Sequence, residues 1–386
     1  MRIGLYGPFL FELAVGLKEH TAHEVCLFLD KKTMPRSLRE ESQLADRSFI
    51  RLGDWETRQA ILCPRVAPIT RELSRFDVVL VTELGPVFAA QSGVQYVFIP
   101  TGWDLTCGPF PIRARRTRSR GVPDLTAAII AARLRGGIRK ARSIWAAPFK
   151  PFTEAVERLG CSIGTDLPQP IDTQLFSPDG GLGETPEAFD GLTIFHPARM
   201  MFTPDPFLVE TGQCKWNDLL LRGFADAVAQ GVEAQLVLLE RASSPDEALA
   251  KELIHELGVD EKVRWLSPET PDGFSWRELA LLYQSSDIVV DEFGGWFGLV
   301  ALEGASCGKP VINCVDEEAM ALMYPGGHPF LQAQTRSEVC DLIVLLSESE
   351  RRETLGKASQ KWVVDNHDRG VVARRCESTL STLGMV

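Results

Sequence analysis

A glycine-rich loop between two short apolar strands is the feature of this sequence that most narrows its possible folds. The stretch DIVVDEFGGWFGLVALEGASCGKPVIN covers residues 287–313. Its apolar runs predict a buried strand at 288–291, a short helix at 299–306 and a second strand at 311–313. A strand, a helix and a strand in this succession are typical of a parallel sheet covered by helices. The segment therefore predicts an α/β protein.

One acidic residue, Glu303, interrupts the apolar helix expected at 299–306. A helix that begins in a glycine-rich loop, here with Gly294, Gly295 and Gly298, presents unpaired N–H groups and a positive dipole end that suit a phosphate. A carboxylate cannot bind that phosphate, but it can accept the paired hydroxyls of a neighbouring ribose. These residues alone leave two readings open: a nucleotide site, or a structural unit in which Glu303 pairs with a backbone group or an arginine.

The same alternation of strands and helices recurs along the whole chain and predicts two Rossmann-like domains. A stretch rich in proline, glycine and acids at 178–191 separates two such halves. The first strand-to-helix loop offers only Gly4 and Gly7, so the G-x-G-x-x-G fingerprint of a dinucleotide-binding dehydrogenase is missing. Strands are expected at 2–6, 24–29, 76–81, 95–99, 142–146, 192–196, 235–239, 262–266, 287–291 and 311–313, and helices at 9–18, 153–159, 216–229, 245–257, 276–285 and 299–306.

Composition excludes several classes of protein. The chain has 386 residues, of which 45% are hydrophobic, enough for two cores. Its six histidines and nine cysteines are dispersed without a C-x2-C pair, so we expect no metal site and a reducing compartment. No apolar run reaches the roughly 18 residues that span a bilayer, and Glu12 interrupts the first apolar segment. The sequence therefore predicts a cytoplasmic protein.

Charge is spread unevenly along the chain. The net charge of −11 disfavours nucleic-acid binding, yet residues 101–150 carry eleven cations against Asp104 and Asp124. The arginines from Arg113 to Arg142 lie in this window. A cationic face of this kind can hold a phosphorylated acceptor or contact an anionic membrane at its inner face, and the alternative is a solvated surface.

The segment FGLVALEGASCGKPVI, from Phe297 to Ile312, resembles a family signature. It is similar to E-G-F-G-x-x-x-x-E-A-x-A-x-G-x-P-V-I of the retaining glycosyltransferases of family 4, which have the GT-B fold. Glu303 stands in place of the second glutamate. Gly295 occupies the register of the first, and the nearest acids, Asp291 and Glu292, come three or four residues too early.

Three further segments resemble the same family. LPQPIDTQLFSP, from Leu167 to Pro178, is similar to its interdomain signature N-G-V-D-x-x-x-F-x-P, and is otherwise a proline-bounded turn. FHPARM and KWNDLLLRGF together resemble G-R-x-x-x-x-K-G-x-D-x-L-I-x-A-F, with an insertion from Met201 to Cys214 between the two cations. PTGWDL resembles the loop H-G-x-D, with Thr101 in place of the histidine.

The resemblance implies an α/β, GT-B fold: two Rossmann-like domains facing each other across a cleft. It implies an amino-terminal acceptor-side domain at 1–166, a linker at 167–190, a donor-binding domain at 191–367 and a final helix at about 368–386 that packs back on the first domain. Arg199 and Lys215 would clamp the donor diphosphate, and Asp104 would orient an acceptor hydroxyl or stabilise a turn. The implied donor-binding set is Glu303, Gly295, Phe297, Gly298, Leu299, Trp265, Thr101 and Gly7, with Glu303 at the ribose and the amides near Phe297 at the distal phosphate.

The implied activity is transfer of a sugar, with retention, from a nucleotide diphosphate-sugar to a hydroxyl of a carbohydrate, a lipid-linked molecule or another acceptor. The resemblance implies no cofactor and no metal, because fixed cations stabilise the leaving group. Two alternatives remain: a nucleotide-sugar epimerase of the same fold, and a catalytically silent nucleotide-sugar-binding subunit, which Thr101 and Gly295 would suit. Neither the base, the sugar nor the acceptor follows from the sequence.

Overall fold

The computed structural model describes residues 1–32, 34, 38, 47–110, 125–179, 191–241, 244–270 and 273–385. The chain forms two compact units, an amino-terminal unit of Met1–Pro170 with Arg369–Val386 and a carboxyl-terminal unit of Ile171–Asp368. The change of unit falls between Pro170 and Ile171, inside the segment 167–190 that the sequence predicted as a linker. Residues 180–190 of that segment lie outside the described residues.

The sheet of the amino-terminal unit contains six parallel strands among its described residues, in the order β3-β2-β1-β4-β5-β6. Strand β3 was not predicted, because Arg51 and Leu52 at its centre are exposed and leave no apolar run. The strands are β1 (Arg2–Tyr6), β2 (Glu24–Asp30), β3 (Ile50–Gly53), β4 (Val78–Val81), β5 (Gln95–Phe98) and β6 (Ser143–Ile144).

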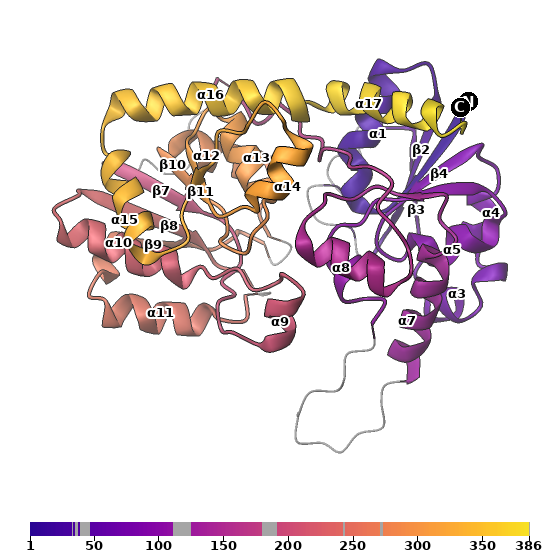
Figure 1. Cartoon of the computed structure of the whole chain (residues 1–386), viewed down its shortest axis with the longest axis horizontal. Helices are drawn as coiled ribbons and strands as arrows, with labels where there is room; N and C mark the ends of the chain where they lie inside the picture. Colours follow the sequence, from indigo (N-terminus) through magenta and orange to yellow (C-terminus); the bar gives the residue numbers. More distant parts are fainter. Residues whose placement is uncertain are drawn as a thin grey trace. The chain divides into compact units, whose positions relative to one another are not determined.

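The last helix of the chain belongs to this first unit. Helix α17 (Arg369–Thr382) packs on α1 (Phe11–His20), and the two helices run together in Figure 1. The approach is close enough that a Cβ on Gly16 would collide with the backbone oxygen of Arg369. The other helices are η1 (Pro8–Leu10), α3 (Arg58–Leu62), η2 (Pro64–Val66), α4 (Pro68–Leu73), α5 (Gly85–Ser92), α6 (Trp103–Thr106), α7 (Leu125–Ile138) and α8 (Lys150–Arg158).

The sheet of the carboxyl-terminal unit repeats this topology, in the order β12-β11-β10-β7-β8-β9 with all pairs parallel. In such sheets the strand order reverses between the first and fourth strands, here β7 and β10, and ligands bind at the carboxyl ends of the strands at that point. The strands are β7 (Leu192–His196), β8 (Ala234–Leu239), β9 (Val263–Leu266), β10 (Ile288–Val290), β11 (Val311–Asn313) and β12 (Leu331–Gln332).

Helices cover both faces of this second sheet (Figure 1). Helix α10 packs against α11 and α15, whereas α13 packs against α12 and α16. Among the described residues, no helix is both long and apolar enough to cross a membrane. The helices are α9 (Pro206–Glu210), α10 (Asp218–Ala229), α11 (Glu247–Glu256), η3 (Asp260–Lys262), α12 (Trp276–Ser285), α13 (Leu299–Ser306), α14 (Glu317–Met323), α15 (Arg336–Leu345) and α16 (Ser349–His367).

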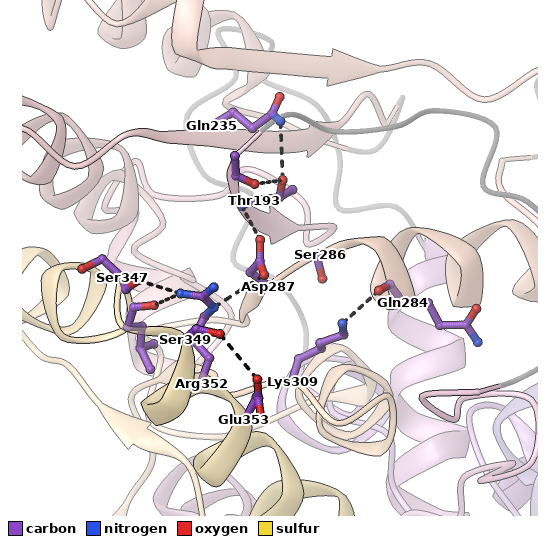
Figure 2. A network of polar contacts seen from close by, with 12 residues as sticks. Thr193, Gln235, Gln284, Ser286, Asp287, Lys309, Ser347, Ser349, Arg352 and Glu353 are labelled. Atoms are coloured by element: carbon purple, nitrogen blue, oxygen red, sulfur yellow. Dashed lines mark hydrogen bonds and ion pairs between the residues drawn. The ribbon is translucent and has the colours of Figure 1, made fainter.

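A polar network fastens the amino-terminal edge of the same sheet (Figure 2). Asp287 Oδ2 accepts from the backbone N–H of Thr193 at 2.9 Å, and Asp287 Oδ1 lies 3.5 Å from Nε of Arg352 on α16. Arg352 also donates to the backbone oxygens of Leu346 and Ser347, each at 2.8 Å. These bonds join the starts of β7 and β10 to α16, so Asp287 is structural and lies at the edge away from the carboxyl ends of the strands.

Candidate functional site

A buried histidine and asparagine organise the carboxyl end of β7. His196 Nδ1 lies 2.8 Å from the backbone oxygen of Val290, and His196 Nε2 lies 2.9 Å from Nδ2 of Asn217. Because a carbonyl oxygen can only accept, Nδ1 carries the hydrogen and Nε2 accepts from the amide. Burial lowers the pKa of His196 to about 4, so the ring is neutral at pH 7.

Asn217 also holds the backbone around Arg199. Its Nδ2 donates to the backbone oxygen of Arg199 at 3.0 Å, and its Oδ1 accepts from the N–H of Met201 at 2.9 Å. The backbone N–H of Lys215 donates to the backbone oxygen of Met201 at 2.7 Å. The backbone oxygen of Lys215 accepts from the N–H of Phe293 at 2.9 Å. The loops after β7 and β10 are therefore tied to the start of α10. The insertion 201–214 leaves Lys215 beside these loops and just before α10, the helix that the sequence predicted to follow it.

The residue after Lys215 has an unusual backbone. Trp216 has a φ of +52°, in the left-handed region that disfavours side chains other than glycine. The motif that this segment resembles has glycine at this position. This chain has tryptophan there, in a backbone conformation that favours glycine. The Trp216 side chain packs partly buried against the hydrophobic core of the unit, which offsets some of the backbone cost.

The two predicted phosphate-binding cations differ in their surroundings. Lys215 forms an ion pair with the buried Glu292. Burial lowers the pKa of Lys215, while the carboxylate of Asp291 opposes this effect. Within the described ranges, the guanidinium of Arg199 makes no hydrogen bond or ion pair, so Arg199 offers all its donors to a ligand.

The amino end of α13 is capped by a carboxylate. Asp291 Oδ2 accepts from the N–H of Gly298 at 2.9 Å, and the backbone of Ala301 also stabilises this carboxylate. Burial nevertheless raises the pKa of Asp291. The Gly298 amide, one of the predicted phosphate donors, is therefore occupied by Asp291 in this structure. The roles of Phe297 and Leu299 stay predictions.

Gly295 lies just before this helix and has a φ of +94°. Its N–H donates to the oxygen of Cys314 at 3.1 Å, and its own oxygen accepts from Asp316 at 2.8 Å. These bonds fix a conformation in which a glutamate would be strained. The backbone of the loop thus explains why glycine stands in the register of the first family glutamate.

Glu303 faces the adjacent helix α12. Its side chain is 6% exposed, and Oε2 accepts from the hydroxyl of Tyr283 at 2.8 Å. Within the described residues, its other oxygen, Oε1, accepts no hydrogen bond. Burial raises the pKa of Glu303 to about 7, although the Tyr283 hydroxyl and Arg241 both lower it. Proton uptake near neutral pH thus controls the charge of this residue.

Aromatic packing holds Tyr283 in place. Its ring contacts Phe195 of β7 and Phe176, with centroid separations of 5.2 and 6.0 Å and near-perpendicular planes. Phe176 belongs to the segment that resembles the interdomain signature. Asp172 Oδ1 of that segment accepts from the N–H groups of Gln174 and Leu175, so the segment forms the turn that the sequence left open as an alternative. It supports Glu303 through Tyr283.

Trp265 lies on the edge strand β9 and contacts α11. The ammonium of Lys251 lies 4.9 Å from its ring centroid, and the ring packs partly buried against the core. A contact of Trp265 with the donor base stays a prediction.

In the amino-terminal unit, Asp104 is a backbone cap. Its carboxylate accepts from the N–H groups of Thr101 at 2.8 Å, Gly102 at 3.1 Å and Glu83 at 2.8 Å. It is buried, and burial raises its pKa while these bonds lower it. The geometry favours the turn-stabilising reading over the orienting of an acceptor hydroxyl.

Gly7 and Glu83 follow β1 and β4 at the switch point of the first sheet. Gly7 has a φ of +116°, and a Cβ there would collide with Oγ1 of Thr82. Glu83 has a φ of +51°, and burial, together with Glu56, raises its pKa to about 7. No pattern in the sequence marks Glu83, because its surroundings depend on segments distant in the chain.

The arginine-rich window is only partly described. Arg113, Arg115, Arg116, Arg118 and Arg120 lie outside the described residues. Of the others, Arg133 donates to the backbone oxygen of Leu62, Arg135 to that of Pro109, and Arg139 to that of Leu159. These three cations therefore fasten α7 to neighbouring segments.

Comparison with known proteins gives relatives in sequence and neighbours in structure. No protein-family profile matches the chain. The D-inositol 3-phosphate glycosyltransferase of Rhodococcus jostii is 37% identical over 104 residues, which cover 25% of this chain and 22% of that protein. The protein of the same name from Corynebacterium aurimucosum is 32% identical over 154 residues, covering 38% and 35%. The chain thus matches only a minor part of the length of these relatives.

Solved structures match over the whole chain. Anabaena HepE in complex with UDP and glucose has a TM-score of 0.63 at 18% identity, covering 99% of this chain and 100% of that one. Sucrose-phosphate synthase from Thermosynechococcus elongatus has a TM-score of 0.63 at 14% identity, covering 100% and 99%. The chain has the GT-B fold, as its motifs predicted. Its resemblance to GT-B glycosyltransferases is confirmed in both sequence and structure.

Proposed function

We propose that this protein is a glycosyltransferase that moves a sugar from a nucleotide diphosphate donor to an acceptor hydroxyl, with retention of configuration. The observation that carries the proposal is that Arg199 and Lys215 lie by the loop after β7, where Asn217 binds the backbone of Arg199 and Met201 and the N–H of Lys215 binds the Met201 oxygen. The names of the curated relatives and the fold of the solved neighbours support the class of reaction.

The chemistry needs positive charge more than it needs a base. The bond between the sugar C1 and the diphosphate oxygen breaks, a bond from C1 to the acceptor oxygen forms on the same face, and the departing phosphate takes the acceptor proton. Fixed cations stabilise the negative charge that the diphosphate gains in the transition state. In this proposal Arg199 and Lys215 are those cations, and no metal is required.

Lys215 changes partner when the donor binds. In the structure its ammonium is paired with Glu292. Phosphate oxygens of the donor would replace that carboxylate. Because any anion must compete with Glu292 for Lys215, this ion pair limits how strongly the site binds other anions.

Glu303 would bind the ribose. Tyr283 fixes one carboxylate oxygen, and the other is left for a ribose hydroxyl. A buried carboxylate in an apolar helix costs stability unless it is used, and a hydroxyl donor to an ionised acceptor gives a strong hydrogen bond.

The relatives and neighbours suggest which substrates to test first. HepE was solved with UDP-glucose, and the curated relatives are named for D-inositol 3-phosphate. Purified protein is incubated with uridine, guanosine or adenosine diphosphate sugars, with and without that acceptor and a panel of simple glycosides. Released nucleoside diphosphate and the product's anomeric NMR signals are measured.

Acceptor-dependent transfer with the donor's own anomeric configuration supports the proposal, and an inverted product contradicts the retaining part of it. Conversion of the donor to another sugar without acceptor would identify an epimerase. Binding without any turnover would identify a silent subunit. No binding of any nucleotide sugar refutes the proposal.

A further inference from the structure

The loops after β7 and β8 are tied together by one buried acid that the sequence did not single out. Asp246 Oδ2 accepts from the N–H groups of Phe202 at 2.6 Å and Thr203 at 2.7 Å, and Oδ1 accepts from the Thr203 hydroxyl at 2.9 Å. Its own N–H donates to the Met200 oxygen at 3.2 Å. Ser244 adds a bond from Met200 N–H at 3.3 Å.

This clamp fixes Arg241, two residues beyond the end of β8, beside the loop that carries Arg199. β7 and β8 are neighbouring parallel strands, with His196 opposite Leu238, so the residues that follow them emerge at the same edge of the sheet. Arg241 N–H donates to Oε2 of Glu247 at 3.2 Å, which holds its backbone against the start of α11.

Within the part of the chain that the structure describes, the side chain of Arg241 makes no hydrogen bond or ion pair. Its Nε is buried and makes no hydrogen bond, and within the described residues no carboxylate forms an ion pair with it. Burial lowers its pKa, with Arg199 acting in the same direction and Tyr283 and Glu303 opposing. Its electrostatic neighbours are therefore the residues of the candidate site.

Two arginines that form no ion pair with a described residue lie at adjacent strand ends, an arrangement that is unfavourable unless an anion joins them. Guanidinium groups bind phosphoryl oxygens in paired hydrogen bonds, which a lone ammonium cannot do. Lys215 forms an ion pair with Glu292, whereas Arg199 and Arg241 form none with any residue that the structure describes.

We propose that Arg241 and Arg199 together form a phosphoryl-binding subsite at the carboxyl ends of β8 and β7. The phosphoryl group comes either from the donor diphosphate or from a phosphorylated acceptor. The assignment of this group to a sugar-transfer substrate rests on the proposed function, whereas the binding of an anion does not.

The test uses inorganic pyrophosphate first, because it carries the chemistry without the nucleotide. Calorimetry compares wild type, Arg241→Gln, Arg241→Lys and the control Arg351→Gln. Arg351 lies on α16, is half exposed and pairs with Glu348, so its loss removes the same charge from the surface. Circular dichroism and the melting temperature establish that each variant is folded.

We expect Arg241→Gln to weaken pyrophosphate binding about 10- to 100-fold, the scale of one lost charge-assisted contact. Arg241→Lys should recover part of the lost pyrophosphate affinity, and Arg351→Gln should bind pyrophosphate as strongly as wild type does. A folded Arg241→Gln that binds pyrophosphate like wild type overturns the subsite, as does a wild-type protein that binds none.

Two further titrations identify the source of the phosphoryl group. Weaker UDP binding by Arg241→Gln, with uridine binding unchanged, identifies the donor diphosphate. Unchanged UDP binding with weaker binding of D-inositol 3-phosphate identifies a phosphorylated acceptor. If wild type binds pyrophosphate but transfers no sugar, the proposed function fails while the subsite stands.

Discussion

Replacing Glu303 by glutamine should stabilise the protein and weaken donor binding at the same time. Glu303 is 6% exposed, and burial raises its pKa from the ordinary 4.5 to about 7. The folded protein therefore binds this proton more tightly than the unfolded chain does. The stability that this group contributes is complete below about pH 4.5 and is lost as the pH rises through 7.

The size of the effect follows from that pKa difference. Each pH unit between the two pKa values corresponds to about 1.4 kcal/mol, so at pH 8 the charged Glu303 costs about 3 kcal/mol as an upper bound. Glutamine has nearly the same shape, keeps an oxygen for the Tyr283 hydroxyl and carries no charge. Glu303→Gln should therefore be the more stable protein at pH 8, and at pH 5 the gap should shrink to about a quarter.

Melting temperatures of the two proteins at pH 8 and pH 5 measure this gap. The matched control is Glu353→Gln on α16, since Glu353 is 67% exposed and its charge is solvated. Equal melting temperatures of wild type and Glu303→Gln at pH 8 would refute the view that Glu303 is a buried charge held at a cost.

Donor affinity should move in the opposite direction. We expect Glu303→Gln to bind UDP-glucose about tenfold more weakly at pH 8, the scale of a lost hydrogen bond to a charged group. Wild-type affinity should fall between pH 8 and pH 6 as Glu303 takes up its proton, and the variant should show no such fall. UDP-glucose is the right probe because its diphosphate diester does not titrate in this range. An unchanged affinity of the variant for UDP-glucose would show that Glu303 does not bind the ribose.

Three further predictions concern the two phosphate-binding cations, the need for a metal ion and the arginine-rich window. Arg199→Ala or Lys215→Ala should lower turnover about 100-fold or more with the fold intact, the scale of one transition-state charge contact, and Arg351→Ala should not; near-wild-type turnover of both would remove them from the mechanism. Incubation with EDTA should leave turnover unchanged, and a loss that Mg²⁺ or Mn²⁺ restores would contradict a metal-free reaction. If Arg113 to Arg142 contact a membrane, the protein should float with anionic liposomes at low salt and should stop doing so after Arg-to-Ser changes there; absence of flotation would exclude that contact.

The sequence predicted several strands and helices to the residue, but it missed helices such as α7. Strands β1, β7 and β11 and helices α12 and α13 begin and end at the predicted residues. Strands β3 and β12 were missed. Both lie at sheet edges, where exposure on one side removes the apolar run that marks a buried strand.

The candidate site was only partly predictable. Motif spacing located Arg199, Lys215 and Glu303. The roles of Asn217 and Asp246, which hold the loops around Arg199 and Lys215, were missed because they depend on hydrogen bonds between residues 16 to 44 positions apart. A sequence pattern carries no record of such bonds.

The sequence also did not predict the backbone conformation at two positions. Tryptophan and glutamate give no local signal for a left-handed φ, yet Trp216 and Glu83 both adopt one. Asp104 illustrates the converse case. Its place in a family-like motif suggested chemistry, while its three backbone bonds show that it closes a turn.

In the proposed function the carboxyl end of β7 binds the donor diphosphate. A crystal structure of the wild-type protein soaked with UDP would locate that diphosphate. We expect phosphate oxygens within hydrogen-bond distance of Arg199 and Lys215, with Lys215 released from Glu292 and a ribose hydroxyl on Glu303. A nucleotide bound at any other edge of the sheet, with the Lys215–Glu292 pair intact, would contradict it.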